Sequence, residues 1–376
     1  MARPPAPWKR ARALAALIRH RQLSPQGFRR LCAVAVAALS LIIVTGAAVR
    51  LSGSGLGCPD WPTCADGNIV APWRYHAWVE FGNRLVTVGL SLLCVLTLAG
   101  ALVRSRRRRD LTWLSAGLVG GLLAEIVLGG VTVLEKLAPP FVMAHFLLAV
   151  VFLADAVVLH HRAGLPEEPV PNRPGRARVS GTAEPLVGRE EKWLARMLLV
   201  AMAVVVTLGT VVTSTGPHGG NPQAPRFPFS LHDVAQLHGA SADVFLVFSA
   251  LTLGLMVRSG APRSVIRRGE VLLVALVLEG GIGYTQYFLG VPAALVEVHV
   301  TVVVLLVLAV LRFNLGLAVR RPDTPAQAAT RPQAATRDPA SHLPAAHFPA
   351  TTPSGAVPLP HGAAGGLPTR TPAARS

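Results

Sequence analysis

Charged residues are scarce in this chain, since Asp, Glu, Lys and Arg make up 15% of its 376 residues, against about 25% in an average soluble domain. Acidic residues are the rarer kind, 19 against 36 Lys and Arg, which gives a formal net charge of +17. Four cysteines in a chain of this length exclude a scaffold built on disulfides. Low charge, 51% hydrophobic residues and a mean hydropathy of +0.47 indicate a membrane protein.

The excess of positive charge is one sign of a nucleic-acid partner, but its distribution favours another interpretation. Lys and Arg gather between long apolar runs, which is how membrane proteins fix their topology. We therefore expect no nucleic-acid partner. The sequence has no glycine-rich phosphate loop, no dinucleotide-binding fingerprint and no recognisable Ser-His-Asp arrangement.

Eight apolar runs are long enough to cross a membrane, because a spanning helix needs about 20 mostly apolar residues. Backbone groups inside a bilayer must pair within their own segment, so each run is predicted to be a helix. The fold class is therefore an all-α membrane protein with eight transmembrane helices. The predicted spans are residues 31–50, 78–103, 112–134, 139–161, 193–214, 233–257, 270–289 and 292–312.

Positive charge alternates between the connections of these runs. The segment before the first run and the second, fourth and sixth connections carry 23 Lys and Arg, whereas the other four connections carry only four. The positive-inside rule then predicts that both termini are cytoplasmic, in a multi-pass protein of the plasma membrane, the inner membrane of the cell. The first 30 residues lack the apolar core of a cleavable signal peptide.

Composition divides the chain into five parts. Residues 1–30 are a basic cytoplasmic segment, 31–161 hold the first four helices, 162–192 are a cytoplasmic linker, 193–315 hold the last four helices, and 316–376 are a cytoplasmic tail. The linker is rich in Pro, Arg, Gly and Glu, and the tail in Pro, Ala and Thr. We expect both to be disordered, because they have too few large apolar residues to bury a core.

An internal repeat relates the two sets of helices. The segment Leu102-Val103-Arg104-Ser105 recurs as Met256-Val257-Arg258-Ser259, an offset of 154 residues. Each repeat has an even number of helices, so both enter the membrane from the same side. We predict two pseudo-symmetric four-helix bundles, whose interiors are common places for cofactors. The same offset pairs Glu125 with Glu279, Gly129 with Gly283 and His145 with His299.

His238 and His299 lie at similar depth in the second set, within about 10 Å of the outer ends of their predicted helices. Ionisable side chains inside a membrane are costly and therefore suggest function. Two neutral imidazoles that face each other suit the axial positions of a low-spin heme iron. The alternative is that each histidine only forms a hydrogen bond between helices. We favour the heme interpretation, because His145 repeats the pattern in the first set.

The first set is not a copy of the second. The position that aligns with His238 is near Asn83, a poor iron ligand, and His76 lies two turns earlier, nearer the water. The first site therefore has one firm ligand, His145, and a weak, distant or absent second ligand. An open coordination position binds substrate, whereas a doubly ligated heme transfers electrons. This asymmetry predicts one resident heme and one transient heme.

Glu80 lies within one turn of Asn83, at the predicted membrane border. One interpretation is a salt bridge to Arg84 at i,i+4. The other is a carboxylate beside a reactive carbon, able to accept a proton or to stabilise developing positive charge. For Glu125 and Glu279, which lie inside helices, we favour structural hydrogen bonds between helices.

Cys58 and Cys64 lie in the first outward connection with two prolines between them. The outer compartment permits disulfides, so we predict a bridge. The bridge is either a structural link or a group that exchanges electrons near the first site. The scarce outward arginines are either interface anchors or partners for heme propionates, and they are Arg50, Arg74 and Arg226.

Two other classes of function compete with a heme-modifying enzyme. A di-heme b-type electron-transfer cytochrome predicts two fully ligated hemes, and Asn83 argues against it. A transporter that relays protons through histidines predicts broken helices with polar groups at the bilayer midplane. The polar residues here gather near the outer border instead.

Residues 44–64, VTGAAVRLSGSGLGCPDWPTC, closely resemble the end of the first helix and the disulfide loop of heme A synthases. The segments VEFGNR at 79–84, GGVTVL at 129–134 and IGYTQYF at 282–288, followed by His299, resemble the same family. The resemblance covers roughly residues 30–315. Many members have His three residues after the glutamate, where this chain has Asn83, a pattern of the high-GC Gram-positive type.

This resemblance implies an oxidoreductase that converts the C8 methyl group of heme O to the formyl group of heme A, for terminal oxidases. It implies a heme b held by His238 and His299, a heme O substrate held by His145, and an essential glutamate at Glu80. The second ligand of the substrate heme remains open, with His76 as the candidate.

The implied partners are heme O from the lipid phase, a heme O synthase and a terminal oxidase under assembly. Homo-oligomerisation stays open at this stage.

Overall fold

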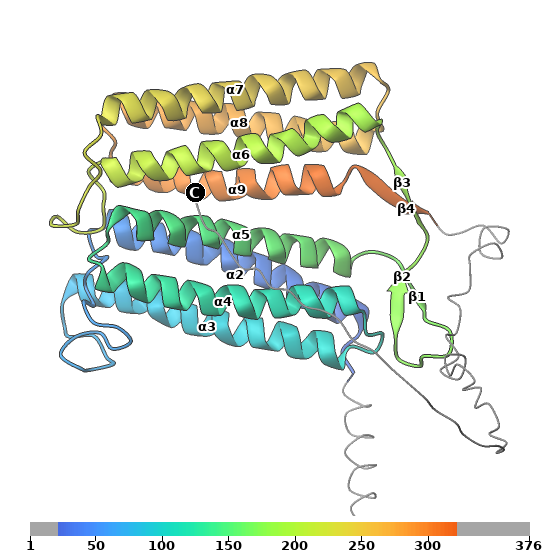
Figure 1. Ribbon diagram of the computed structural model, residues 1–376, viewed down its shortest axis with the longest axis horizontal. Helices are drawn as coiled ribbons and strands as arrows, with labels where there is room; N and C mark the ends of the chain where they lie inside the picture. Colours follow the sequence, from blue (N-terminus) through green and yellow to red (C-terminus); the bar gives the residue numbers. More distant parts are fainter. Residues whose placement is uncertain (1–21, 322–376) are drawn as a thin grey trace, which may run out of the picture. The chain divides into compact units, whose positions relative to one another are not determined.

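The computed structural model describes residues 22–321, in which eight long helices run alongside one another (Figure 1). Each predicted apolar run overlaps one helix, and the predicted and observed ends agree to within seven residues. The helices are α2 (Pro25–Leu51), α3 (Tyr75–Val103), α4 (Arg109–Leu134), α5 (Pro139–Ala163), α6 (Arg189–Thr215), α7 (Leu231–Arg258), α8 (Arg263–Phe288) and α9 (Ala293–Leu315). Within residues 22–321, seven of them, α2–α7 and α9, are long and apolar enough to cross a membrane. The protein is therefore mostly helical, as the sequence predicts for an all-α membrane protein.

Local capping explains where several helices begin. The Ser24 hydroxyl accepts a hydrogen bond from the N–H of Gly27, and Pro25 occupies the first turn of α2, so this helix begins six residues before the predicted apolar run. Ser230 caps α7 through the N–H of Asp233. Helix α5 begins at Pro139, whose missing N–H costs nothing in the first turn of a helix.

The order of packing is the same in the two sets of helices. Helix α2 packs against α3 and α5, and α4 packs between α3 and α5. In the second set, α6 packs against α7 and α9, and α8 packs between α7 and α9. Contacts of α9 with α2 and α5 join the sets, and one buried hydrophobic core includes residues of both, such as Phe28 and Phe313.

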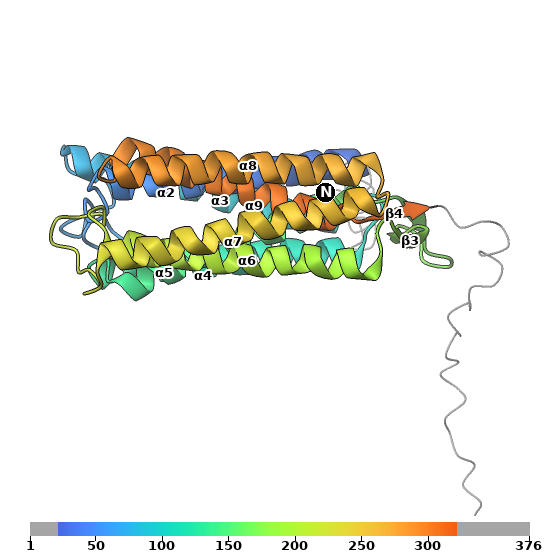
Figure 2. The same cartoon turned by 90° about the horizontal axis from the view of Figure 1, so that it is seen from above.

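The connections divide between the two ends of the helices. The long loops 52–74 and 216–230 lie at one end and the short strands at the other (Figure 1), and the view turned by 90° agrees (Figure 2). The two loops touch, because the N–H of Gly55 donates to the carbonyl of Gly220 at 2.8 Å. Equivalent loops of the two repeats therefore share one end, as parallel repeats require.

The prediction of a disordered linker is wrong for residues 167–185. Strand β1 (Glu167–Pro169) pairs with β2 (Ala177–Val179), and β3 (Thr182–Pro185) pairs with β4 (Ala318–Arg321), both antiparallel. The reason lies in the charges, which are paired rather than solvated: Arg104 contacts Glu167 at 2.8 Å, and both side chains are buried.

Strand β4 also corrects the prediction of a disordered tail for its first residues. The remainder of the tail from residue 322, and residues 1–21 of the basic N-terminal segment, lie outside the described residues.

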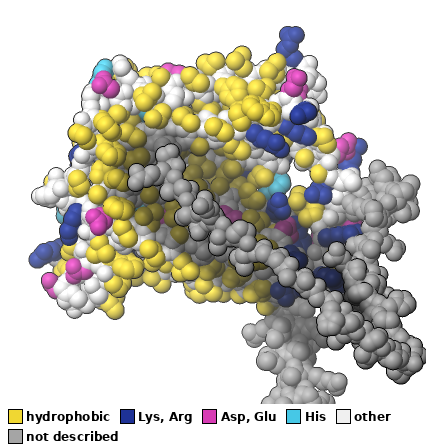
Figure 3. Space-filling model, in the orientation of Figure 1, with side chains coloured by type: hydrophobic (Ala, Val, Ile, Leu, Met, Phe, Trp, Pro, Cys, Tyr) yellow, Lys and Arg dark blue, Asp and Glu magenta, His cyan; other side chains and the backbone are white. Residues whose placement is uncertain are grey.

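Large hydrophobic side chains are exposed along the helices. Figure 3 shows them over much of one face, with Lys and Arg gathered toward the end that carries the strands. A soluble monomer rarely exposes such a continuous apolar surface, so this surface is suited to lipid. Examples are Val88 and Leu92 on α3, Val247 and Leu251 on α7, and Val271, Val274 and Leu278 on α8.

Candidate heme sites

The imidazoles of His238 on α7 and His299 on α9 face each other inside the second set, with ring centroids 6.3 Å apart and planes at 82°. The Nδ1 atom of His238 lies 3.1 Å from the carbonyl oxygen of Val205 on α6. The Nδ1 atom of His299 lies 2.9 Å from Oε1 of Glu279 on α8. All four helices of the second set thus contribute one residue to this pair.

The geometry of this pair fits a heme iron. Both Nδ1 atoms face protein acceptors, so Nε2 is the nitrogen left on each ring for a metal. With a metal–nitrogen bond of about 2 Å, each ring centre lies roughly 3 Å from the metal, and twice that distance matches the observed 6.3 Å. Two imidazoles are a common axial pair for low-spin heme.

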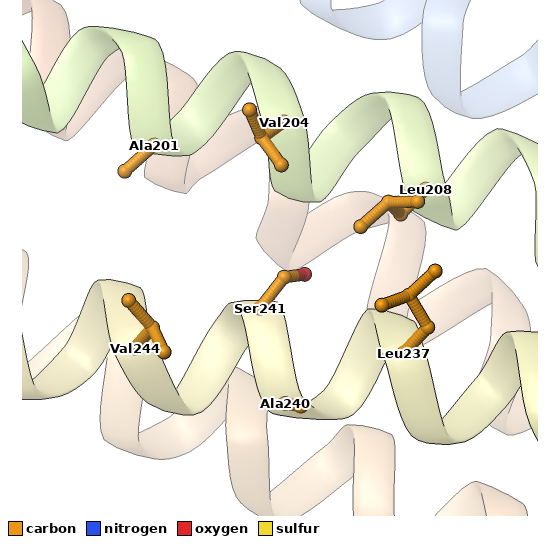
Figure 4. A pocket seen from close by; sticks show the side chains of 7 residues that line it. All are labelled: Ala201, Val204, Leu208, Leu237, Ala240, Ser241 and Val244. Carbon is orange, nitrogen blue, oxygen red and sulfur yellow. The ribbon is translucent and has the colours of Figure 1, made fainter.

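Glycines and a groove make room around the pair. A Cβ atom on Gly209 of α6 would lie 3.1 Å from Cε1 of His238, and one on Gly283 of α8 would lie 3.5 Å from Cε1 of His299. An apolar groove between α6 and α7 is lined by residues that include Leu237, Ala240 and Ser241, close in sequence to His238 (Figure 4). These small residues leave space for the edge of a flat macrocycle.

The first set repeats half of this arrangement. The Nδ1 atom of His145 on α5 lies 2.6 Å from Oε2 of Glu125 on α4. A Cβ atom on Gly129 would lie 3.2 Å from Cε1 of the same ring. The His145 side chain is 42% exposed, against 17% for His299. His145 thus contacts a glutamate as His299 does, but its side chain is more exposed.

Within residues 22–321, the structure places no second imidazole in ring contact with His145. His76 is exposed and directs Nδ1 to the hydroxyl of Ser54 at 2.9 Å, and within residues 22–321 no ring contact joins it to His145. The Oδ1 atom of Asn83 accepts a hydrogen bond from the hydroxyl of Thr45 at 2.8 Å. The described surroundings of His145 therefore differ from those of the His238–His299 pair.

Glu80 is buried beneath the loop that carries the cysteines, with 6% of its surface exposed. Its Oε2 accepts a hydrogen bond from the N–H of Cys58, and its Oε1 accepts one from Arg84, each at 2.8 Å. Arg84 also donates to the carbonyls of Cys58 and Thr63, at 2.9 and 2.7 Å. The salt bridge that the sequence offered as one interpretation is present, and it also holds the loop.

The predicted disulfide between Cys58 and Cys64 is confirmed. The same loop carries Trp61, whose ring packs so closely on α4 that a Cβ atom on Gly130 would lie 2.6 Å from it. Gly129, the residue before it, faces His145. The loop therefore reaches the first site through Trp61, a contact that sequence reasoning missed; two consecutive glycines inside an apolar helix were the available signal.

Two of the three arginines predicted to face outward, Arg50 and Arg226, donate hydrogen bonds to backbone carbonyls. Arg50 donates to the carbonyl of His218 at 2.5 Å. Arg226 donates to the carbonyls of Gly216 and Pro217, at 2.7 and 2.8 Å. Both arginines thereby hold the loop 216–230.

Comparison with known families addresses the first half of the chain most directly. The model of the COX15-CtaA family, described as a cytochrome oxidase assembly protein, matches residues 29–74 and 70–218, just over half of the 376 residues. The chain belongs to the COX15-CtaA family. The matched region includes Glu80, Asn83, Glu125, His145 and the disulfide loop.

Individual relatives of this COX15-CtaA member extend the similarity into the second half. It is 31% identical to the heme A synthase of Symbiobacterium thermophilum over 255 residues, which cover 64% of this chain and 79% of the relative. It is 25% identical to the heme A synthase of a Bradyrhizobium species over 323 residues, covering 73% and 87%. The match to the heme A synthase of Geobacillus kaustophilus is 33% identical over 108 residues, 28% of this chain, and spans only 33% of the relative.

Proposed function

We propose that this chain is a heme A synthase, which oxidises the C8 methyl group of heme O to the formyl group of heme A. The observation that carries the proposal is the contrast between the two sets of helices. The imidazoles of His238 and His299 lie with ring centroids 6.3 Å apart. His145 contacts a glutamate of its own, as His299 does, but no other imidazole faces it among residues 22–321. The names of the relatives agree with this reading.

The resident cofactor in this proposal is heme b in the second set, held by Nε2 of His238 and Nε2 of His299. When bound, it supplies electron transfer. The chain's own contribution is orientation, because the carbonyl of Val205 and the carboxylate of Glu279 face the two Nδ1 atoms. Gly209 and Gly283 keep both rings free of a neighbouring Cβ.

The substrate heme O would enter the first set from the lipid phase and bind through His145. Asn83 accepts a hydrogen bond from Thr45, and His76 directs Nδ1 to the hydroxyl of Ser54. These contacts leave the second coordination position of the substrate heme open to exchange. An open position suits a molecule that must enter and leave, since a second strong ligand would slow its release.

Glu80 is the proposed catalytic carboxylate. Written with water as the oxygen donor and an external two-electron acceptor, a first oxidation converts the methyl carbon and one water molecule to an alcohol, and a second converts the alcohol and another water molecule to the hydrated aldehyde, which then loses water. Each oxidation passes two electrons to the acceptor and releases two protons. The N–H of Cys58 and the guanidinium of Arg84 hold Glu80, and its oxygens keep further lone pairs with which to accept a proton or stabilise a cationic carbon.

We also propose that all eight helices span the plasma membrane as two four-helix bundles, with residues 31–161 and 193–315 as the two heme-binding units. The exposed valines and leucines of α8 support a lipid-facing position for this helix. The surplus of Lys and Arg at the strand-bearing end supports cytoplasmic termini. Partners would be a heme O synthase, a terminal oxidase under assembly and further copies of the chain.

The test is to express the full chain with a heme O supply, purify it in detergent and analyse the extracted hemes. We expect one heme b per chain, a smaller amount of heme O or heme A bound to it, and heme A accumulating in the membranes. Two equivalents of heme b without heme A would instead indicate a di-heme cytochrome. A colourless protein would overturn every heme-based proposal and favour a transporter.

A further inference from the structure

The last helix of each repeat carries a proposed iron ligand, His145 or His299. Each of these histidines contacts a glutamate on the preceding helix. Glu125 on α4 approaches Nδ1 of His145 at 2.6 Å, and Glu279 on α8 approaches Nδ1 of His299 at 2.9 Å. In each case a glycine follows the glutamate by four residues, Gly129 or Gly283, and lies against the same imidazole. The structure thus contains one arrangement twice, in parts of the chain that are 154 residues apart.

The histidine is the group that these carboxylates face. Glu279 is 7% exposed, and neither of its oxygens has a hydrogen-bond partner among residues 22–321. The Nδ1 atom of His299 is within contact distance, although the approach is too bent for a formal hydrogen bond, and the same is true of the Glu125–His145 contact. A buried carboxylate without a partner is costly, so a ring N–H directed at it is its natural complement.

We propose that Glu279 and Glu125 are positioning residues for the iron-binding imidazoles, and this inference rests on the proposed function. Each carboxylate accepts the Nδ1–H of its histidine, which fixes the tautomer and leaves Nε2 as the metal-binding nitrogen. A carboxylate on the far side of a ligating imidazole also increases the electron density that the ring donates to the metal. His238 has only the neutral carbonyl of Val205 in that place, so the two axial ligands of one heme differ in donor strength.

The glycines are the second part of the arrangement. A Cβ atom at Gly129 would lie 3.2 Å from the His145 ring, and one at Gly283 would lie 3.5 Å from the His299 ring. The first distance is tighter than an ordinary contact, so a side chain at position 129 would require the His145 ring to give by a few tenths of an ångström, whereas the second is an ordinary contact. Each glycine thus lies against the imidazole that the glutamate one turn earlier contacts through Nδ1.

The decisive experiment compares Glu279→Gln and Glu279→Ala in the full chain, purified in detergent with its heme. Glu279→Gln has the same shape and can still accept the Nδ1–H through its amide oxygen, so we expect it to keep heme b. Its midpoint potential should shift to a more positive value, because the negative charge is gone. Glu279→Ala should lose heme b to apomyoglobin about 10- to 100-fold faster than the unmodified protein, the usual effect of removing such a partner.

Glu125→Gln is the matched control, since it makes the same change in the other repeat. The potential and the electron paramagnetic resonance g-values of the low-spin heme should stay unchanged in this variant, and the affinity for added heme O should fall. Unchanged potential, g-values and heme retention in both Glu279 variants would overturn the inference. If Glu279→Ala does not fold, the potential of Glu279→Gln decides alone.

His299→Ala distinguishes this inference from the proposed function. Loss of the low-spin signal in His299→Ala with no effect of the Glu279 variants would contradict the positioning role only. A low-spin signal that survives His299→Ala would contradict the proposed ligand set itself.

Discussion

The backbone N–H of Cys58 donates a hydrogen bond of 2.8 Å to Oε2 of Glu80. The first residue of the disulfide loop therefore holds the proposed catalytic carboxylate at the start of α3. Arg84 reinforces the contact from the same helix, because it binds both Glu80 and the carbonyl of Cys58. Changes to the loop and changes to the carboxylate should consequently have related effects.

Replacing Glu80 with Ala should stop the conversion of heme O while heme b stays bound, because Glu80 lies in the first set and the His238–His299 pair lies in the second. The measurement is the ratio of heme A to heme O in extracts, together with the absorption spectrum of the purified protein. Glu135→Gln, an exposed carboxylate in the neighbouring connection, should leave both readouts unchanged. Normal heme A production by Glu80→Ala would refute the catalytic role.

Removing the disulfide with Cys58→Ala and Cys64→Ala should lower heme A production without loss of heme b. The loop would lose a covalent restraint, a change typically equivalent to about 2 kcal/mol, and would hold Glu80 less firmly. Heme analysis of the double variant, alongside protease digestion of the loop, checks this. A double variant that is digested faster but makes heme A at the normal rate would show that the disulfide restraint on the loop is not needed for the oxidation of heme O.

The two sets of helices should respond differently to loss of their histidines. His299→Ala should abolish the low-spin heme spectrum, because it removes one of the two facing imidazoles. His145→Ala should retain that spectrum and lose heme A formation. Spectra of the purified variants decide the matter, and an identical spectral loss in both would argue against a division of roles between the two sets.

Substitution of Gly209 by Ala should disturb the heme b site, because the new Cβ would lie 3.1 Å from Cε1 of His238 and the ring must shift by a few tenths of an ångström. We expect an altered low-spin signal and faster loss of heme. Gly280→Ala is the control, since a Cβ there meets no atom within 4 Å. Equal behaviour of the two variants would show that the ring has more freedom than the packing indicates.

The helices could be predicted because their signal is local: long apolar runs, with Ser24 and Pro25 marking one start. The repeat offset also paired His145 with His299 and Glu125 with Glu279 before any contact was visible. The sequence could not reveal that each glutamate faces its histidine, since that depends on how α4 packs on α5 and α8 on α9.

Non-local pairing explains most of what the sequence did not predict. Strand β3 pairs with β4, and Thr182 opposes Arg321 across more than a hundred intervening residues. Neither strand has the alternation of apolar and polar residues from which a strand is predicted. The ion pair between Arg104 and Glu167 has the same origin, as does the packing of Trp61 on Gly130.

The pairing of β3 with β4 has a consequence for the architecture of the second repeat. Strand β3 comes just before α6 and β4 comes just after α9, so the entry and exit of this four-helix unit are fastened to each other. A unit whose two ends meet can be copied, fused or reconnected in a new order without stretching its chain. The ribbon of β3 and β4 thus fastens together the two ends of the second set of helices, while α9 still packs against α2 and α5.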